Sequence, residues 1–286
     1  MAQQLRIGIT VGDPAGIGPE IIERALASEK FPSHWHLSRI GACEGFEVGK
    51  PSPASAHAAW RALEKAAELA RCREIDAIVT GPVSKNQLHQ VGFQFPGQTE
   101  FFAARASIQD FAMLLTGGRL TVALVTAHIP LMETARLLNE KEIVRVGKLL
   151  HTFLLRRGVK VPRIAVAGLN PHAGENGDLG REEIDVIRPA VRILTSIGRF
   201  EGPYPPDTIF HRAIKGEFDA VLCMYHDQGL IPLKLHAFDT GVNVTLGLPY
   251  VRTSPDHGTA FEIAGKGIAR PESMIAAIQL AGELLS

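Results

Sequence analysis

The sequence has no excess of charge of either sign. Thirty Lys and Arg residues balance 30 Asp and Glu residues over 286 positions. A nucleic-acid-binding face or a patch for anionic lipid needs clustered basic charge, so we expect no nucleic-acid and no membrane partner. No apolar run approaches the roughly 20 residues of a membrane-spanning helix. Residues 1–12 lack the basic start and long apolar run of a signal peptide. We therefore expect a cytoplasmic protein.

Cysteine is also scarce. Cys43, Cys72 and Cys223 are far apart, form no CxxC pair and are odd in number, so no disulfide framework is expected. This usage suits a reducing compartment. The apolar fraction of 45% is ordinary, and 286 residues can bury a core. The composition therefore predicts a globular protein of one large or two medium domains.

Strand-like runs alternate with helical segments along the chain, which predicts an α/β protein with a largely parallel sheet. The expected strands are residues 5–11, 75–80, 112–115, 120–125, 163–167 and 218–224. The expected helices include residues 54–70, 141–155 and 182–197. Residues 29–53 contain three prolines and are expected to be irregular. No linker stands out, so two domains would have to share strands or exchange chain segments.

A glycine-rich turn, GDPAGIGPE at residues 12–20, connects the first strand to a helix. The strand–turn–helix order resembles a phosphate cradle. However, the spacing is not GxGxxG, and Pro14 and Pro19 lack backbone donors. Two interpretations stay open: the turn contacts a ligand directly, or it brings the helix close to the sheet.

Three of the 11 histidines, His128, His172 and His226, each follow an apolar strand and precede a loop or a helix. In open α/β sheets the carboxyl ends of the strands line the ligand crevice. Three imidazoles that converge there would form a catalytic divalent-metal site with open positions. The alternative is that each is a surface or capping residue. Asp207 and Asp227 are candidates to orient the rings or to move a proton.

Four polar residues are candidate ligands of a phosphate or carboxylate: Thr99, Lys234, Asn243 and Arg252. Arg offers a planar fork and Lys a point charge, whereas Asn and Thr orient an anion without adding charge. The alternative is that Lys234 and Arg252 are solvated surface charges. Both lie among apolar, Gly and Pro residues, which favours the binding role.

Several motifs together carry a family resemblance over about Ile7 to Ala281. They are GDPAGIGPE, GPVSK, FPGQTEF, TAHIPL, GLNPHAGENGDLGREE, PPDT, MYHDQGL and GVNVTLGLPYVRTSPDHGTA, in this order. With them the chain resembles the 4-hydroxythreonine-4-phosphate dehydrogenase (PdxA) family of pyridoxal phosphate biosynthesis. The resemblance implies the fold of the isocitrate and isopropylmalate dehydrogenases, with two α/β domains and a cleft between them. It implies a first domain of residues 1–95 plus 256–286 and a second of residues 96–255, which carries the metal ligands and the dimer interface.

A second resemblance concerns the cofactor. The segment HGTAFEIAGKGIARP is similar to the adenosine-binding loop of isopropylmalate dehydrogenases. This implies that His257, Gly258, Thr259 and Ala260 face the adenosine half of the cofactor. Glu262 falls where that loop has Asp. A carboxylate there can accept a hydrogen bond from a ribose 2′-hydroxyl and would repel a 2′-phosphate, which favours NAD over NADP.

The PdxA resemblance also assigns a site. It implies His128, His172 and His226 as ligands of a divalent metal (zinc, magnesium, manganese or cobalt), contributed by both subunits of a homodimer. It implies substrate contacts for a small phosphorylated molecule from Gln98, Thr99, Lys234, Asn243 and Arg252. The general base is not assigned, and the candidates are Asp207, Asp227 and Lys85. Lys85 could equally be a surface charge at a helix end.

The reaction implied is NAD-dependent oxidation of 4-phosphooxy-L-threonine (4-hydroxythreonine 4-phosphate) to 2-amino-3-oxo-4-phosphooxybutanoate. Decarboxylation of this β-keto acid gives 3-amino-2-oxopropyl phosphate. A family dehydrogenase of D-erythronate or D-threonate 4-phosphate is the nearest alternative. A metal-dependent phosphate-ester hydrolase is a more distant one.

Two departures from the family pattern bear on these expectations. Gln98 stands where the family usually has His, and Gln can hydrogen-bond an anion but cannot carry charge or move a proton. The stretch of residues 29–50 is much shorter than in the family, so a peripheral strand or hairpin of the first domain is expected to be missing.

Overall fold

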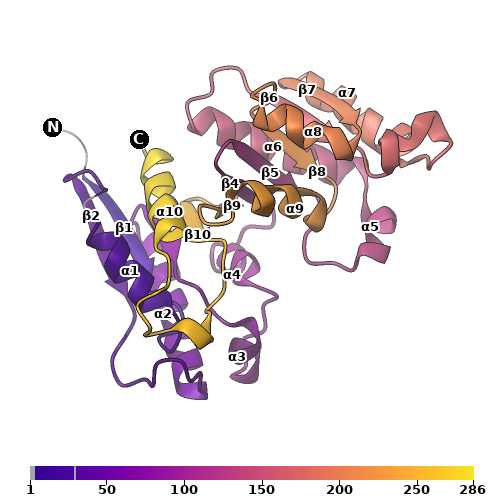
Figure 1. Ribbon diagram of the computed structural model, residues 1–286. Coiled ribbons are helices and arrows are strands. Elements are labelled where there is room, and N and C mark those ends of the chain that lie inside the picture. The colour runs from indigo at the N-terminus through magenta and orange to yellow at the C-terminus, as the bar shows by residue number, and fades with distance from the viewer. Residues whose placement is uncertain (1–3, 29) are drawn as a thin grey trace. The chain divides into compact units, whose positions relative to one another are not determined.

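The computed structural model describes residues 4–28 and 30–286. The chain forms two compact units (Figure 1): Met1–Gln109 with Val242–Ser286, and Asp110–Gly241. The division expected from the resemblance put residues 96–109 and 242–255 in the second domain, and here both belong to the first unit. The reason is strand pairing across the sequence: β10 (Val251–Pro255) pairs with a strand of the first unit, and Arg252 binds Thr80 there.

The first unit is built around five strands in the order β2-β1-β3-β10-β9. They are β1 (Leu5–Thr10), β2 (Trp35–Ile40), β3 (Ala77–Thr80), β9 (Val242–Leu246) and β10. All neighbouring pairs are parallel except β9, which runs antiparallel to β10. Every residue of β3 and β10 is buried, which is typical of central strands covered on both faces.

Five α-helices and one short 3-10 helix accompany this sheet: α1 (Gly18–Leu26), α2 (Pro53–Arg71), α3 (Lys85–Gln90), α4 (Gln98–Arg105), α10 (Glu272–Glu283) and η3 (Phe261–Ile263). The predicted helix over 54–70 is confirmed as α2. It begins at a capping box, in which Ser52 and Ser55 each accept a hydrogen bond from the other's backbone amide. The expected N-cap Ser84 also accepts from the amide of Gln87, at 3.3 Å, where α3 begins.

The second unit has the strand order β4-β5-β8-β6-β7. Its strands are β4 (Ala112–Gly117), β5 (Leu120–Leu124), β6 (Arg163–Ala167), β7 (Arg199–Tyr204) and β8 (Ala220–Cys223). Its helices are α5 (Leu131–Leu137), α6 (Glu140–Arg156), α7 (Arg188–Thr195), α8 (Pro206–Ile214) and α9 (His226–Ala237), with short turns η1 (Pro171–Gly177) and η2 (Glu183–Ile187). β4 and β5 form an antiparallel hairpin, whereas β5, β8, β6 and β7 run parallel.

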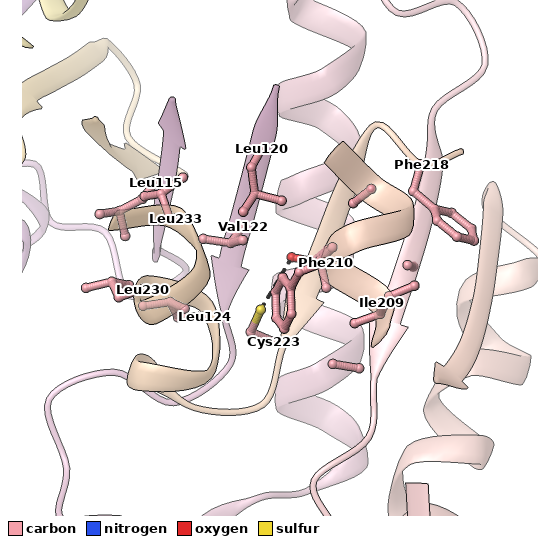
Figure 2. Packing of buried hydrophobic residues seen from close by; sticks show 14 of the residues in the cluster. Leu115, Leu120, Val122, Leu124, Ile209, Phe210, Phe218, Cys223, Leu230 and Leu233 are labelled. Atoms are coloured by element: carbon pink, nitrogen blue, oxygen red, sulfur yellow. Dashed lines mark hydrogen bonds between the residues drawn. The ribbon is translucent and has the colours of Figure 1, made fainter. Parts of the chain in front are cut away.

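Alternate side chains of these strands build the core of the second unit (Figure 2). Val122 and Leu124 of β5 and Cys223 of β8 point to the same face of the sheet, as the period of two in a strand requires. On that face they meet Ile209 and Phe210 of α8 and two leucines of α9, Leu230 and Leu233. Helix α9 is therefore held against the sheet by its apolar side, and this fixes where its first residue, His226, lies.

The prediction of an irregular stretch at residues 29–53 was wrong for residues 35–40, whereas residues 30–34 and 41–52 contain no helix or strand and residue 53 begins α2. Residue 29 lies outside the described residues. Residues Trp35–Ile40 form β2, which pairs with β1 along its whole length. The strand has only one fully buried residue, Ile40, because it is an edge strand, so its sequence shows little apolar alternation. The helix predicted over 182–197 begins as a π-turn, η2, and continues as α7. None of the helices in the described part of the chain has the length and apolarity needed to cross a bilayer.

Candidate active site

Three neighbouring strands of the second unit deliver the three predicted histidines to one edge of the sheet. β8 lies between β5 and β6 and runs parallel to both, with Leu124 opposite Cys223 and Val166 opposite Leu222. The carboxyl ends of parallel neighbours lie at the same edge. His226 follows β8 after two residues, and His128 and His172 follow β5 and β6 after slightly longer loops.

His128 and His226 are brought together. Their ring centroids are 5.8 Å apart, and both line a pocket of about 230 Å³. Ala127, Ile129 and Leu131 supply apolar walls, and Thr134, Tyr225 and Asp227 supply polar groups. Two imidazoles in a small, partly apolar pocket are a suitable pair of ligands for a divalent cation.

Carboxylates orient two of the histidine rings. Nδ1 of His226 lies 2.6 Å from Oδ1 of Asp227, and Nδ1 of His172 lies 2.7 Å from Oε1 of Glu175. A metal-binding histidine usually donates one ring nitrogen to a carboxylate, which fixes the tautomer and leaves the other nitrogen for the metal. The donor chemistry of these residues therefore fits a divalent ion bound through Nε2.

His172 lies on an unusual left-handed turn. Residues 172–176 all have positive φ, from 43° at Glu175 to 80° at Gly174. Each non-glycine residue in this conformation costs about 1–2 kcal/mol, so the surroundings must hold it in place. Within residues 4–28 and 30–286, no group of three or more His, Cys, Asp or Glu side chains is close enough to hold a metal.

Arg252 is the centre of a second cluster, in the first unit. It is 2% exposed, and its guanidinium donates to four neutral oxygens: Thr80 Oγ1 at 2.6 Å, Gln98 Oε1 at 3.0 Å, Thr245 Oγ1 at 3.2 Å and Asn243 Oδ1 at 3.4 Å. Its Nε has no hydrogen-bond partner among the described residues. Burial lowers the pKa of Arg252 to about 10, and the charge of Glu100 opposes this shift. A buried cation surrounded by neutral acceptors is a strong site for an anion.

Helix α4 begins at this cluster. Gln98 and Thr99 are its first two residues, and Thr99 Oγ1 lies 3.4 Å from Thr245 Oγ1. The backbone N–H groups at a helix N-terminus favour an anion. Lys85 approaches the same place, because a Cβ on Gly97 would lie 3.5 Å from its Nζ. The structure therefore brings together Gln98, Thr99, Asn243 and Arg252, with Lys85 beside them.

Two further predicted residues lie in the second unit. Lys234 is half-buried on α9, with its Nζ 5.9 Å from the centroid of the Phe238 ring. Asp207 is exposed in the first turn of α8. Asp227 is also exposed and contacts His226, as described above.

The predicted cofactor loop, residues 257–262, lies against the N-terminal turn of α1. The amide of Ile17 donates to the carbonyl of Thr259 at 2.9 Å, and Oε2 of Glu20 accepts from the amide of Gly265 at 3.1 Å. Ala260 has a left-handed conformation, with φ 42°. Glu262 is exposed, and a Cβ on Gly258 would meet no atom within 4 Å. An open glycine and an exposed carboxylate on a supported loop fit the adenosine half of a dinucleotide.

These contacts also explain the glycine-rich turn at residues 12–20. A Cβ on Gly12 would lie 2.3 Å from the carbonyl oxygen of Pro82, and one on Gly16 would lie 2.8 Å from that of Thr259. Gly12 also has φ +74°, which favours glycine. Close packing of backbone on backbone accounts for both glycines, and at Gly16 the turn packs against Thr259 of the 257–269 segment.

Sequence reasoning missed three residues that hold the predicted ones: Thr80, Thr245 and Glu175. Thr80 and Thr245 bind Arg252, and Glu175 binds the ring of His172. Glu175 lies three residues after His172, and this spacing was the only local signal. Thr80 is 172 residues from Arg252, so no local pattern links the two.

The fold class follows from solved structures. An isocitrate dehydrogenase from Methylococcus capsulatus matches with a TM-score of 0.55 at 17% identity, over 99% of this chain and 86% of that one. This confirms the expected fold, that of the isocitrate and isopropylmalate dehydrogenases, and at such identity it shows the fold alone. The chain belongs to the PdxA family, because the family described as pyridoxal phosphate biosynthetic protein PdxA matches residues 18–281.

Similar proteins of known name agree with this family membership. The chain is 43% identical to a 4-hydroxythreonine-4-phosphate dehydrogenase from Caulobacter vibrioides, over 97% of both chains. It is 40% identical to a D-threonate 4-phosphate dehydrogenase from Pectobacterium atrosepticum, over 97% of this chain and 98% of that one. A crystal structure of a 4-hydroxythreonine-4-phosphate dehydrogenase from Klebsiella pneumoniae matches with a TM-score of 0.83 at 38% identity, over 99% of this chain and all of that one. The chain is therefore an oxidoreductase.

Proposed function

We propose that this chain is an NAD-dependent and divalent-metal-dependent dehydrogenase of 4-phosphooxy-L-threonine, acting in pyridoxal phosphate biosynthesis. The product would be 2-amino-3-oxo-4-phosphooxybutanoate, which loses CO₂ to give 3-amino-2-oxopropyl phosphate. The observation that carries the proposal is the buried guanidinium of Arg252. Its four hydrogen-bond acceptors are all neutral, so a phosphate dianion would pair with the guanidinium directly, in addition to the nearby charge of Glu100.

Each group of residues has a task in this proposal. Arg252, Thr99 and Asn243 bind and orient the phosphate, and Gln98 holds one guanidinium nitrogen of Arg252. Lys234 is a further candidate substrate contact. His128, His172 and His226 hold the metal, and Asp227 and Glu175 fix two of their rings. A divalent ion there would lower the pKa of the substrate hydroxyl and stabilise the enolate of the decarboxylation step. Asp207, Asp227 and Lys85 are the candidate bases that take the hydroxyl proton as hydride leaves for NAD.

We also propose a homodimer whose subunits share each metal site. His128 and His226 lie together in one chain, and His172 of the partner subunit would be the third ligand. An apolar surface adjoins the pair. On α9, Ile231 is 67% exposed and Leu235 is 89% exposed, and Phe238, at the end of the helix, is 74% exposed. Leu131 of α5 is 69% exposed and lines the histidine pocket. Ile231, Leu235 and Phe238 are spaced four and three residues apart and so share one face of the helix. An exposed apolar face of this kind favours a protein interface.

The test is turnover with each of two substrates. The purified dimer, supplied with NAD and Mg²⁺, Mn²⁺ or Zn²⁺, is expected to raise the near-ultraviolet absorbance of reduced nicotinamide on addition of 4-phosphooxy-L-threonine. A strong chelator is expected to abolish this signal, and His172→Ala is expected to remove nearly all turnover while the dimer persists. The proposal would be rejected if addition of 4-phosphooxy-L-threonine produced no reduced nicotinamide. It would also be rejected if activity stayed full with the chelator present.

D-threonate 4-phosphate or D-erythronate 4-phosphate is the second candidate substrate. Gln98 keeps this alternative open, because this residue replaces the usual His of the family and cannot carry charge or move a proton. A relative named D-threonate 4-phosphate dehydrogenase also matches over nearly the whole chain. The ratio of kcat/KM for the two substrates decides between them. The same assay with NADP in place of NAD measures the preference between the two cofactors.

A further inference from the structure

Two buried side chains of the second unit bind the backbone at the base of the loop that carries His172. Gln228 is 6% exposed and Glu183 is 1% exposed. Gln228 Nε2 donates to the carbonyl of Gly168 at 2.6 Å. Glu183 Oε1 accepts from the amides of Leu169 and Asn170, both at 2.7 Å. Three consecutive residues, 168–170, are therefore fixed just before the left-handed turn.

The second carboxylate oxygen of Glu183 also contacts the left-handed turn at residues 172–176. This oxygen, Oε2, accepts from Asn170 Nδ2 at 3.0 Å. A Cβ on Gly174 would lie 2.6 Å from the same oxygen, so the turn lies directly on this carboxylate. Glu183 belongs to the π-turn η2, a local irregularity of the kind that often occurs at functional sites. The carboxylate thus holds a backbone conformation that L-residues otherwise avoid.

The other end of Gln228 holds the turn of His226. Its Oε1 accepts from the amide of Met224 at 2.7 Å. The carbonyl of Met224 in turn accepts from Thr126, through the backbone N–H at 3.2 Å and through Oγ1 at 2.8 Å. Thr126 lies two residues before His128. One chain of hydrogen bonds therefore runs from the His128 loop through Met224 and Gln228 to the His172 loop.

We propose that Gln228 and Glu183 are positioning residues that set the distance between His172 and the His128–His226 pair. This inference rests on the proposed function. In a shared-site dimer each chain gives the pair to one metal and His172 to the other, so the Gln228 bridge links the two half-sites of one subunit. Neither residue touches the substrate or the metal. Their effect is on the geometry of the ligands.

The primary test is Gln228→Met in the full-length dimer, with Co²⁺ as the probe. Met has nearly the volume of Gln but makes neither hydrogen bond. Competition with a chelator is expected to show Co²⁺ affinity about 10–100-fold weaker than in the wild type. The visible d–d spectrum is expected to change, because it reports the coordination geometry. Gln228→Glu keeps the acceptor for Met224 but loses the donor to Gly168, and it is expected to behave like Gln228→Met.

Thr121→Val is the matched control. It removes a buried hydrogen bond of the same unit, between the hydroxyls of Thr116 and Thr121 at 2.8 Å, at the opposite end of β5. It is expected to lower Tm as Gln228→Met does, with Co²⁺ affinity and spectrum unchanged. If Gln228→Met also lowers Tm but keeps the wild-type affinity and spectrum, the residue is merely structural and the inference is overturned.

Two further measurements keep the test decisive. If Gln228→Met does not fold, Thr126→Val removes only the hydroxyl link to Met224, and it is expected to weaken Co²⁺ binding severalfold; unchanged binding would count against the bridge. Amide hydrogen exchange of residues 168–176 in the metal-free dimer is expected to be faster in the Gln228 variant. This measurement needs no metal, so it separates failure of the inference from failure of the proposed function, which would show as a wild type that binds no Co²⁺.

Discussion

The side chain of Asp227 holds the ring of its neighbour, His226, with Oδ1 2.6 Å from Nδ1. Because the carboxylate accepts a hydrogen bond from Nδ1–H, the lone pair of Nε2 is left for a metal. We expect Asp227→Asn to weaken metal binding by about 10–100-fold, since an amide holds the tautomer less firmly. Chelator competition measures this. Glu217→Gln, which alters only the surface pair with Arg212, is the control and should leave the affinity unchanged. Equal affinity of Asp227→Asn and wild type would remove Asp227 from the metal site.

The second prediction concerns phosphate and Arg252. Inorganic phosphate is expected to raise Tm by about 2–4 °C, because it binds the folded state alone. Arg252→Met should abolish this shift. Arg252→Lys should recover little of it, since an ammonium cannot reach Thr80 and Thr245 at once. Arg61→Met, at an exposed position of α2, should keep the shift. A phosphate effect that survives in Arg252→Met would place the anion elsewhere.

The pKa of Arg252 gives this binding a pH dependence. Burial lowers the pKa to about 10 from the usual 12.5. The guanidinium is therefore charged at neutral pH and loses its proton as pH rises through about 10. A bound dianion favours the charged form, so phosphate affinity should be full below this value and fall above it. An affinity that does not change across this range would contradict the assignment.

The third prediction concerns cofactor choice. Glu262 is exposed on the loop at residues 257–262, where a carboxylate would repel a 2′-phosphate. Glu262→Ser is therefore expected to raise kcat/KM with NADP relative to NAD by roughly tenfold. Glu74→Ser, an exposed acidic position of the same unit, is the comparison. If the NAD/NADP ratio stays the same in both variants, Glu262 does not read the ribose.

The fourth prediction concerns the apolar surface of α9. Leu235 is 89% exposed in the single chain, so Leu235→Glu should leave the fold of each subunit intact. In a dimer that buries this surface, the same change places an unpaired charge in an apolar contact. We expect sedimentation to show a monomer that has also lost tight metal binding. Val161→Glu, at another exposed apolar position, should remain dimeric. A monomer that keeps full metal affinity would show that each site is complete within one chain.

Much of the fold could be predicted from the sequence because its buried strands are continuous apolar runs. β3, β4, β5 and β8 are almost wholly buried, so short β-branched and apolar segments marked them clearly. β2 could not be predicted in this way, because an edge strand needs only one buried face. The domain boundary also lay beyond local signals, since it depends on the pairing of β10 with β3.

The candidate site shows the same division. A histidine at the end of an apolar strand is a local pattern, and the parallel order β5-β8-β6 places three such ends at one edge. The supports of these residues come from distant parts of the chain. Gln228 reaches Gly168 across 60 positions, and Arg252 reaches Gln98 across 154. Such contacts form only when helices and strands pack together, so no spacing in the sequence predicts them.

The place of β10 in the first unit has a consequence for synthesis. β10 is inserted between β3 and β9, and all of β9, β10 and α10 come from the end of the chain. During translation, β1, β2 and β3 leave the ribosome early. One edge of β3 then stays unpaired until its partner β10 is synthesised. The continuous segment Asp110–Gly241 can fold in the meantime. An unpaired and mostly apolar strand edge invites association with other chains. We therefore expect the nascent N-terminal segment to be most prone to aggregation before β10 is synthesised.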